Sequence, residues 1–145
     1  MPNTLLKFFA LFFMLTTFSS KAAVILQYHH VSDNTPDSTS ISPQQFAVHL
    51  QYLYDNKFTV VALSELVSAI QKQQILPDKT VAITFDDAYL DNLIHAKPIL
   101  DKFNFPYTIF VNPGIINRNQ NTKKSQYLSW QQLKVLAEED VIIAN

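Results

Sequence analysis

Residues 81–87, Val81-Ala82-Ile83-Thr84-Phe85-Asp86-Asp87, carry the strongest fold signal in this chain of 145 residues. An uninterrupted run of apolar and β-branched residues is typical of an interior strand of a parallel sheet. Two carboxylates follow the run directly, and the carboxyl end of a strand is where α/β folds place their chemistry. The stretch therefore predicts an α/β fold and a candidate site at Asp86 and Asp87.

Strand-like and helix-like patterns alternate on both sides of this run. Strands are expected over 24–28, 58–61, 107–111 and 141–143, and helices are expected to begin at Ser42, Ser64, Asn92 and Ser129. Such alternation indicates parallel strands joined by helical crossovers. Because a complete (β/α) barrel needs roughly 200–250 residues, the sequence predicts a partial barrel.

The helix starts are predicted from capping patterns. Ser42 and Ser129 each stand three residues before a glutamine, which is the order of residues in a capping box. Ser64 is expected to cap the second helix. Pro98 lies inside the third helical segment, where it is expected to kink the helix or move its start.

The composition disfavours several classes of function. The net charge is −1 and no basic block occurs, so neither nucleic acid nor an anionic membrane is an expected partner. The chain has no cysteine, which excludes disulfides, thiolate metal sites and cysteine nucleophiles. Hydrophobic residues make up 48%, as in an ordinary globular protein.

Residues 1–22 have the pattern of a secretory signal peptide. Lys7 precedes an apolar run over 8–18, and small residues follow up to Ala23. The apolar run is shorter than the roughly 20 residues that span a bilayer, so no stable membrane span is expected. We therefore expect a signal peptide over 1–22, a single domain over 23–145, and a secreted or periplasmic location.

Two explanations fit a pair of aspartates at a strand end. A single aspartate at this position often caps the following helix. Adjacent carboxylates repel each other, however, unless a cation or a raised pKa relieves the repulsion. A divalent metal would supply that cation, with one acid as its ligand and the other as a base acting on metal-bound water.

The surroundings of the pair resemble the polysaccharide deacetylases, carbohydrate esterase family four, including members that act on poly-N-acetylglucosamine. Residues 81–89 resemble the first motif of that family, and residues 26–31, Leu-Gln-Tyr-His-His-Val, look like its opening tyrosine-histidine strand. Residues 96–111 and 127–133 are similar to the elements that follow. The resemblance implies that 23–145 is the N-terminal part of a NodB-homology domain with a partial barrel.

The resemblance also implies roles for the two acids. It makes Asp86 the general base and Asp87 a ligand of a divalent metal, with zinc as the expected ion. The implied reaction removes N-acetyl groups from a polysaccharide, at amide C–N bonds that are not peptide bonds. In the family two histidine ligands follow in a later motif, which residues 141–145 approach, so a truncated chain with an incomplete site is expected. Ala88 replaces the usual glycine and would disfavour a positive φ.

The four histidines are not expected to replace the missing ligands. His29 and His30 end the first strand, and we predict that they bind substrate, with packing as the alternative for each. His49 and His95 are expected to be structural. None of the four has the spacing to Asp87 of a zinc site.

Two further interpretations stay open. The chain can be an inactive fragment that lacks the histidine ligands, or a carbohydrate-binding module in which Tyr89 or Trp130 stacks on a sugar. A glycoside hydrolase is disfavoured, because its two acids must face each other about 5 Å or more apart across the scissile bond. An N-acetylated polysaccharide is the expected partner.

Overall fold

The computed structural model describes residues 23–119 and 125–145, so the predicted signal peptide lies outside the described residues. The main sheet contains β1 (Val24–Tyr28), β4 (Thr59–Val60), β5 (Thr80–Phe85), β6 (Thr108–Phe110) and β7 (Ile142–Ala144). Its strand order is β1-β5-β6-β7, with β4 also paired to β5. All pairs are parallel. The predicted α/β fold with parallel strands is confirmed, and the strands within the described residues form an open sheet.

β5 is the central strand, and all six of its residues are buried. β1 pairs with it from Val24, opposite Val81, to Tyr28, opposite Phe85. β4 pairs with the amino end of β5 and β6 with its carboxyl end. Because β1 occupies one edge of β5, β4 and β6 share the other edge.

The apolar run that opens β1 is typical of a buried strand, but none of the five residues of β1 is buried. Val24 is 48% exposed and Ile25 is 51% exposed. Within the described residues β1 pairs only with β5, so it is an outer strand of the sheet. An apolar, β-branched run does not by itself distinguish an outer strand from a central one.

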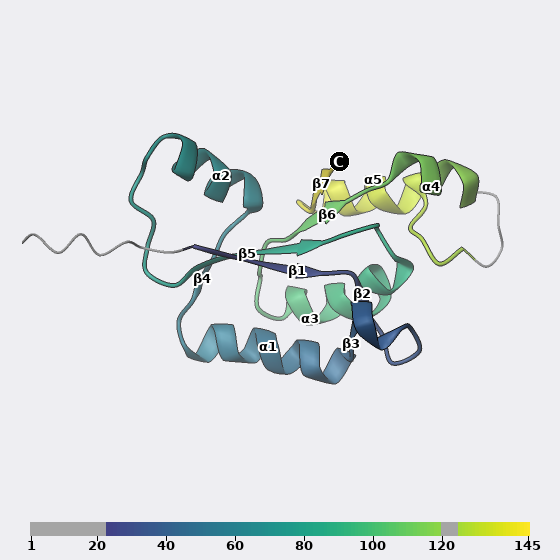
Figure 1. The fold of residues 1–145 in the computed structure, drawn as a ribbon, viewed down its shortest axis with the longest axis horizontal. Coiled ribbons are helices and arrows are strands. Elements are labelled where there is room, and N and C mark those ends of the chain that lie inside the picture. The colour runs from purple at the N-terminus through teal and green to yellow at the C-terminus, as the bar shows by residue number, and fades with distance from the viewer. Residues whose placement is uncertain (1–22, 120–124) are drawn as a thin grey trace, which may run out of the picture.

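The helices are α1 (Pro43–Asp55), α2 (Leu63–Gln71), α3 (Lys97–Asp101), α4 (Pro113–Asn119) and α5 (Trp130–Glu138). Figure 1 shows α1 and α3 side by side beneath β1 and β5, and α5 lies against β7. A short 3-10 turn (Asp37–Thr39) and the two-residue strands β2 (His30–Val31) and β3 (Ser40–Ile41) lie beyond the end of β1. In the described part of the chain, no helix is long and apolar enough to cross a membrane.

The capping predictions for α1 and α5 are confirmed. The Ser42 hydroxyl accepts from the N–H of Gln45 at 3.1 Å. At α5 the box is reciprocal, because the N–H of Gln132 donates to Ser129 Oγ at 3.3 Å and the N–H of Ser129 donates to Gln132 Oε1 at 2.8 Å. These contacts satisfy backbone donors that a helix start leaves unpaired.

The cap predicted for α2 is wrong. The helix begins at Leu63 and its N-cap is Ala62, whose N–H donates to Glu65 Oε2 at 3.3 Å. Ser64 therefore lies inside the first turn. A glutamate at the third helical position here supplies the cap contact that was assigned to serine.

Pro98 changes the third helical segment as predicted. A turn of π-helix covers Asn92–Ala96, and α3 follows from Lys97. The N–H of Lys97 donates to the Asn92 carbonyl, which is the wider π-type spacing. Pro98 then stands in the first turn of α3, where a missing backbone donor costs little.

Candidate active site

The carboxyl ends of β1 and β5 lie side by side. Tyr28 is paired with Phe85, and the N–H of Asp86 donates to the Tyr28 carbonyl at 2.9 Å. The backbone pairing thus continues one residue beyond the end of β5. It places Asp86 next to His29, with side-chain exposures of 26% and 34%.

Two side chains, one from β1 and one from the residue that follows it, approach the same oxygen of Asp86. Gln27 Nε2 donates a hydrogen bond to Oδ2, and His29 Nε2 lies 3.7 Å from that atom. Oδ1 makes no hydrogen bond within the described residues. The carboxylate is therefore held through one oxygen, and the other oxygen is available to a reacting molecule.

Sequence reasoning missed Gln27. The signal was present, because residues two apart on a strand point to the same face and Gln27 stands two positions before His29. The part of the first strand that reaches the candidate site therefore includes Gln27 as well as the predicted His29.

The chain turns sharply after Asp86. Asp87 has a φ of 65° and Ala88 a φ of 52°, so two consecutive residues adopt the left-handed conformation. Such φ values are uncommon outside glycine and strain a residue with a Cβ. The positive φ expected to be unfavourable for Ala88 is therefore the one it adopts, and its side chain is fully buried.

Neighbouring hydrogen bonds hold this turn in place. The N–H of Leu128 donates to the Ala88 carbonyl at 2.8 Å, and the N–H of Leu90 donates to the Gln126 carbonyl at 2.7 Å. Surrounding structure of this kind allows strained conformations to persist. The Asp87 side chain that follows the turn interacts with Tyr89.

Tyr89 connects the turn to its surroundings. Burial raises the pKa of Tyr89 to about 12, and the neighbouring Tyr127 and Asp87 add to the shift. The ring of Tyr89 stacks with His30 at a centroid distance of 3.6 Å and with Tyr127 at 4.9 Å. The Tyr89 ring, which is a candidate for stacking on a sugar, is therefore already stacked on two protein rings.

His29 and His30 occupy different environments. His30 is 7% exposed, and its Nδ1 lies 2.6 Å from Asp91 Oδ2. Asp91 Oδ1 also accepts from the N–H of Val31 at 3.1 Å, so Asp91 anchors β2 to the segment after β5. His29 is the more exposed of the two and is the one beside Asp86.

The other two histidines each contact a segment distant in sequence. His95 Nδ1 lies 2.7 Å from the Val31 carbonyl oxygen, and His49 Nδ1 lies 3.2 Å from the Tyr28 hydroxyl. Trp130, the other candidate for sugar stacking, donates from Nε1 to Asn117 Oδ1 at 2.7 Å.

A metal site is not complete in the described residues. They contain no group of three or more histidine, cysteine, aspartate or glutamate side chains placed to hold a metal ion. A zinc site takes three or four protein ligands. Asp87 alone therefore does not make a metal centre, and the donor set in residues 23–119 and 125–145 does not fit one.

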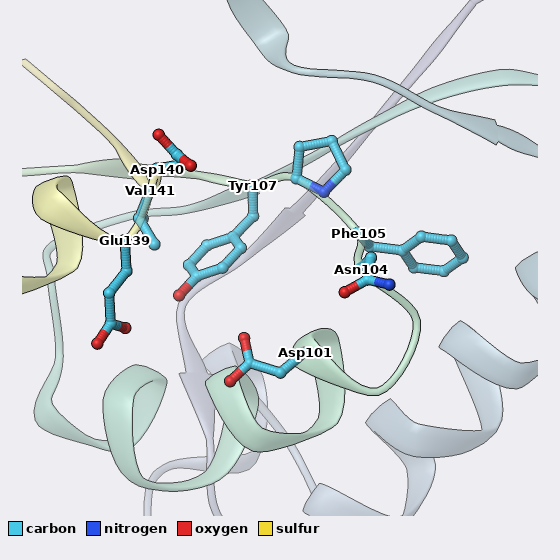
Figure 2. Close-up of a pocket in the computed structure, with 8 residues that line it drawn as sticks. Asp101, Asn104, Phe105, Tyr107, Glu139, Asp140 and Val141 are labelled. Carbon is cyan, nitrogen blue, oxygen red and sulfur yellow. The ribbon is translucent and has the colours of Figure 1, made fainter.

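A cavity of about 380 Å³ lies at the amino ends of β6 and β7. Figure 2 shows the Tyr107 hydroxyl pointing between the carboxylates of Glu139 and Asp101. Lys97 Nζ bridges those two acids, at 3.0 Å from Glu139 and 2.8 Å from Asp101. Burial, followed by these two negative charges, raises the pKa of Tyr107. Tyr107 and Val141 precede β6 and β7, so this cavity is remote from Asp86.

The segment that contains Asp86 and Asp87 is similar to known proteins. A sequence model of the family described as polysaccharide deacetylase matches residues 73–145, half of the chain. YxkH of Bacillus subtilis (strain 168), whose name ascribes it to the polysaccharide deacetylases, is 30% identical over 119 residues, 82% of this chain. Poly-beta-1,6-N-acetyl-D-glucosamine N-deacetylase of Escherichia coli (strain K12) is 31% identical over 85 residues, 57% of this chain.

Solved structures show the same fold. IcaB from Ammonifex degensii superposes with a TM-score of 0.71 at 30% identity, over 86% of this chain and 52% of that one. The de-N-acetylase from Aggregatibacter actinomycetemcomitans gives a TM-score of 0.72 at 23% identity, over 84% and 53%. This chain thus spans about half the length of these structures, 40% of YxkH and 13% of the Escherichia coli enzyme.

Proposed function

The chain belongs to the polysaccharide deacetylase family, and on that premise we propose that it removes N-acetyl groups from a polysaccharide. The bond hydrolysed is an amide C–N bond that is not a peptide bond. One observation carries the proposal: the Asp86 carboxylate stands at the carboxyl end of the central strand, with one oxygen held by Gln27 and the other available.

In this proposal Asp86 is the general base. Its free oxygen accepts the proton of a water molecule as that water attacks the amide carbonyl carbon. The Gln27 side chain is a neutral amide that does not titrate, so it orients the carboxylate without competing for the proton of the attacking water. Contact with the bound sugar is assigned to His29, 3.7 Å from the same carboxylate, while the buried His30 lies 2.6 Å from Asp91.

We propose Asp87 as a ligand of a divalent metal, with zinc as the ion. When bound, such a metal polarises a carbonyl and lowers the pKa of water. The described residues do not complete its coordination. The proposal requires at least two further ligands from outside these residues.

The substrate proposed is a β-1,6-linked polymer of N-acetylglucosamine. The support is the 31% identity to an enzyme whose name specifies that polymer. We also propose that residues 1–22 direct export, so that the protein meets this polymer in the periplasm or outside the cell.

Product analysis tests this function. The protein is incubated with poly-β-1,6-N-acetylglucosamine, with and without added zinc, and acetate, primary amines and new reducing ends are measured. We expect acetate and amines to appear in equal amounts, with no new reducing ends. New reducing ends without acetate would show a glycoside hydrolase instead. Polymer binding that chelators do not affect, without any product, would show a binding module.

A further inference from the structure

The cavity at the amino ends of β6 and β7 plays no part in the proposed function. Its volume is about 380 Å³, and it lies between the segment that leads from α3 into β6 and the one that leads from α5 into β7. The N–H of Ile142 donates to the Tyr107 carbonyl at 3.3 Å and joins these two segments. The lining residues are Asp101, Asn104, Phe105, Pro106, Tyr107, Glu139, Asp140 and Val141.

A buried hydroxyl faces this cavity without a partner. Tyr107 is 5% exposed, and its hydroxyl makes no hydrogen bond to any described residue. Figure 2 shows the hydroxyl pointing between the carboxylates of Glu139 and Asp101. An edge-to-face contact with Phe85, at a centroid distance of 5.8 Å, fixes the ring from the core side. A buried polar group without a partner is costly, so this position favours a molecule that hydrogen-bonds the hydroxyl.

The lining is negatively charged. It contains the carboxylates of Asp101, Glu139 and Asp140 and no lysine or arginine. Lys97 Nζ balances one of these charges, because it lies 2.8 Å from Asp101 Oδ2 and 3.0 Å from Glu139 Oε2. The second oxygen of each of these two acids, and the Asp140 carboxylate, make no hydrogen bond or ion pair within residues 23–119 and 125–145. Two negative charges therefore stay unbalanced.

The backbone adds to this negative potential. α3 ends at Asp101 and α5 ends at Glu138, so the carboxyl ends of two helices adjoin the cavity. The carboxyl end of a helix carries a partial negative charge and attracts cations. Side chains and backbone thus both favour a positively charged ligand.

The remaining lining favours an organic cation over a metal ion. Among the described residues, no three histidine, cysteine, aspartate or glutamate side chains are placed to hold a metal. Phe105, Pro106 and Val141 give the cavity an apolar part, which contributes nothing to an inorganic ion but can pack against a carbon skeleton. Ligand sites measure roughly 300–1,000 Å³, so about 380 Å³ suits a molecule of the size of one sugar ring.

We propose that this cavity binds a small organic molecule that carries a protonated primary amine. The ammonium group has three N–H donors, and it donates to the Tyr107 hydroxyl and to the free carboxylate oxygens. An amino sugar and an aliphatic amine both supply this group. The site is separate from Asp86, so the inference does not depend on the proposed function.

The ionisation state of Tyr107 is consistent with this role. Burial, followed by the negative charges of Asp101 and Glu139, raises the pKa of Tyr107. The hydroxyl therefore stays neutral near neutral pH, and its oxygen accepts from the ammonium while its proton is free to donate to a carboxylate.

A matched pair of ligands tests the charge requirement. Glucosamine and N-acetylglucosamine share the sugar ring, but only glucosamine carries an ammonium group. Ethanolamine supplies the same group without a sugar. NMR amide shifts over 104–107 and 139–141 are followed in titrations at mildly acidic pH and constant ionic strength. We expect glucosamine to bind about tenfold or more tightly than N-acetylglucosamine. Tighter binding of glucosamine than of ethanolamine would identify an amino sugar as the source, and the reverse an aliphatic amine.

Two substitutions test the residues. Tyr107→Phe keeps the ring and removes a hydroxyl that has no partner, so the thermal midpoint should not fall, while glucosamine affinity falls about fivefold or more. Asp140→Asn removes one lining charge, and Asp33→Asn removes the charge of an exposed acid that does not line the cavity. We expect a loss of about threefold or more for Asp140→Asn and less than about twofold for Asp33→Asn.

Four results would overturn the site. They are unchanged glucosamine affinity of Tyr107→Phe, equal affinity of the two asparagine variants, no shift with either amine, and displacement of glucosamine by an equal concentration of calcium. Loss of glucosamine binding in Asp86→Asn would instead place the ligand at the candidate active site and would contradict the inference as well. Absence of acetate release, with glucosamine binding intact, would contradict the proposed function alone.

Discussion

Ala88 combines two properties that rarely occur together, a φ of 52° and complete burial. A left-handed conformation costs a residue with a Cβ about 1–2 kcal/mol. Replacing Ala88 by glycine relieves that cost, but it loses about 0.8 kcal/mol of methyl burial and increases the entropy of the unfolded chain. These effects largely cancel, which explains how alanine can stand at a position with a positive φ.

We therefore predict that Ala88→Gly changes the free energy of unfolding by less than about 1 kcal/mol. Ala88→Val should destabilise the protein by about 2–3 kcal/mol, because a β-branched side chain fits neither the positive φ nor the closed packing. Urea unfolding at neutral pH measures both. A neutral valine variant would show that the turn is not held as described.

Tyr28 predicts the response of the fold to alkali. Burial raises the pKa of Tyr28 to about 12, whereas the unfolded chain has the ordinary value of 10. Above pH 10 the unfolded state therefore loses its proton first, so the free energy of unfolding falls between about pH 10 and 12. Tyr28→Phe should reduce that fall, and the exposed Tyr52→Phe should not. Urea unfolding at a series of pH values checks this, and identical slopes for both variants would contradict it.

At the scale of single residues, the sequence predicted the aspartate pair but not its supports. Asp86 and Asp87 follow a run whose burial is readable from its side chains. Gln27 and Asp91 hold the site through contacts between segments about sixty positions apart. The spacing of Gln27 and His29 indicates a shared face of the strand, but no local pattern indicates which distant residue either side chain contacts. The separation of His29 from His30 depends on the same contacts.

At the scale of elements, helix starts were predictable where a side-chain cap determines them. Ser129 and Gln132 form both halves of a capping box. Ser64 has the same residue type but lies one position inside α2. The two serines form a natural comparison between a cap and a surface residue.

We predict that Ser129→Ala lowers the free energy of unfolding by about 1 kcal/mol, because it removes an N-cap acceptor. Ser64→Ala should change it by less than about 0.5 kcal/mol, as for surface positions without such a role. Thermal unfolding of the two variants makes the comparison. Equal losses would mean that the cap on α5 contributes nothing specific.

The positions of the strands were predictable from the sequence, but the burial of β1 was not. The run over 24–28 forms β1 with the expected bounds, yet it lies at the outside of the described sheet. Central β5 and outer β1 have similar compositions, so only the pairing order distinguishes them. The change in the third helical segment was predictable from Pro98, because a missing backbone donor acts locally. The segment begins with a π-turn before α3.

For the whole molecule, one geometric relation carries the account: parallel strands bring residues distant in sequence to a common edge. The carboxyl ends of the strands hold Asp86, Gln27 and His29, and beside them lies a polar cavity lined by residues 27–30 and 38–41. The acidic cavity at Tyr107 lies at the amino ends of the strands. The sequence predicted the fold class and the edge. It could not predict the polar cavity, because the segment between β2 and β3 depends on backbone pairing across only two residues on each side.

The rate of acetate release from poly-β-1,6-N-acetylglucosamine by the Asp86→Asn variant tests the central claim most directly. Asparagine preserves the shape of the side chain but cannot accept the proton, so the rate should fall at least 100-fold, within the usual range of about 10²–10⁴ for general bases. Unchanged circular dichroism would establish that the fold is retained. A variant rate close to that of the unaltered protein, or no acetate release by either, would contradict the assignment of Asp86.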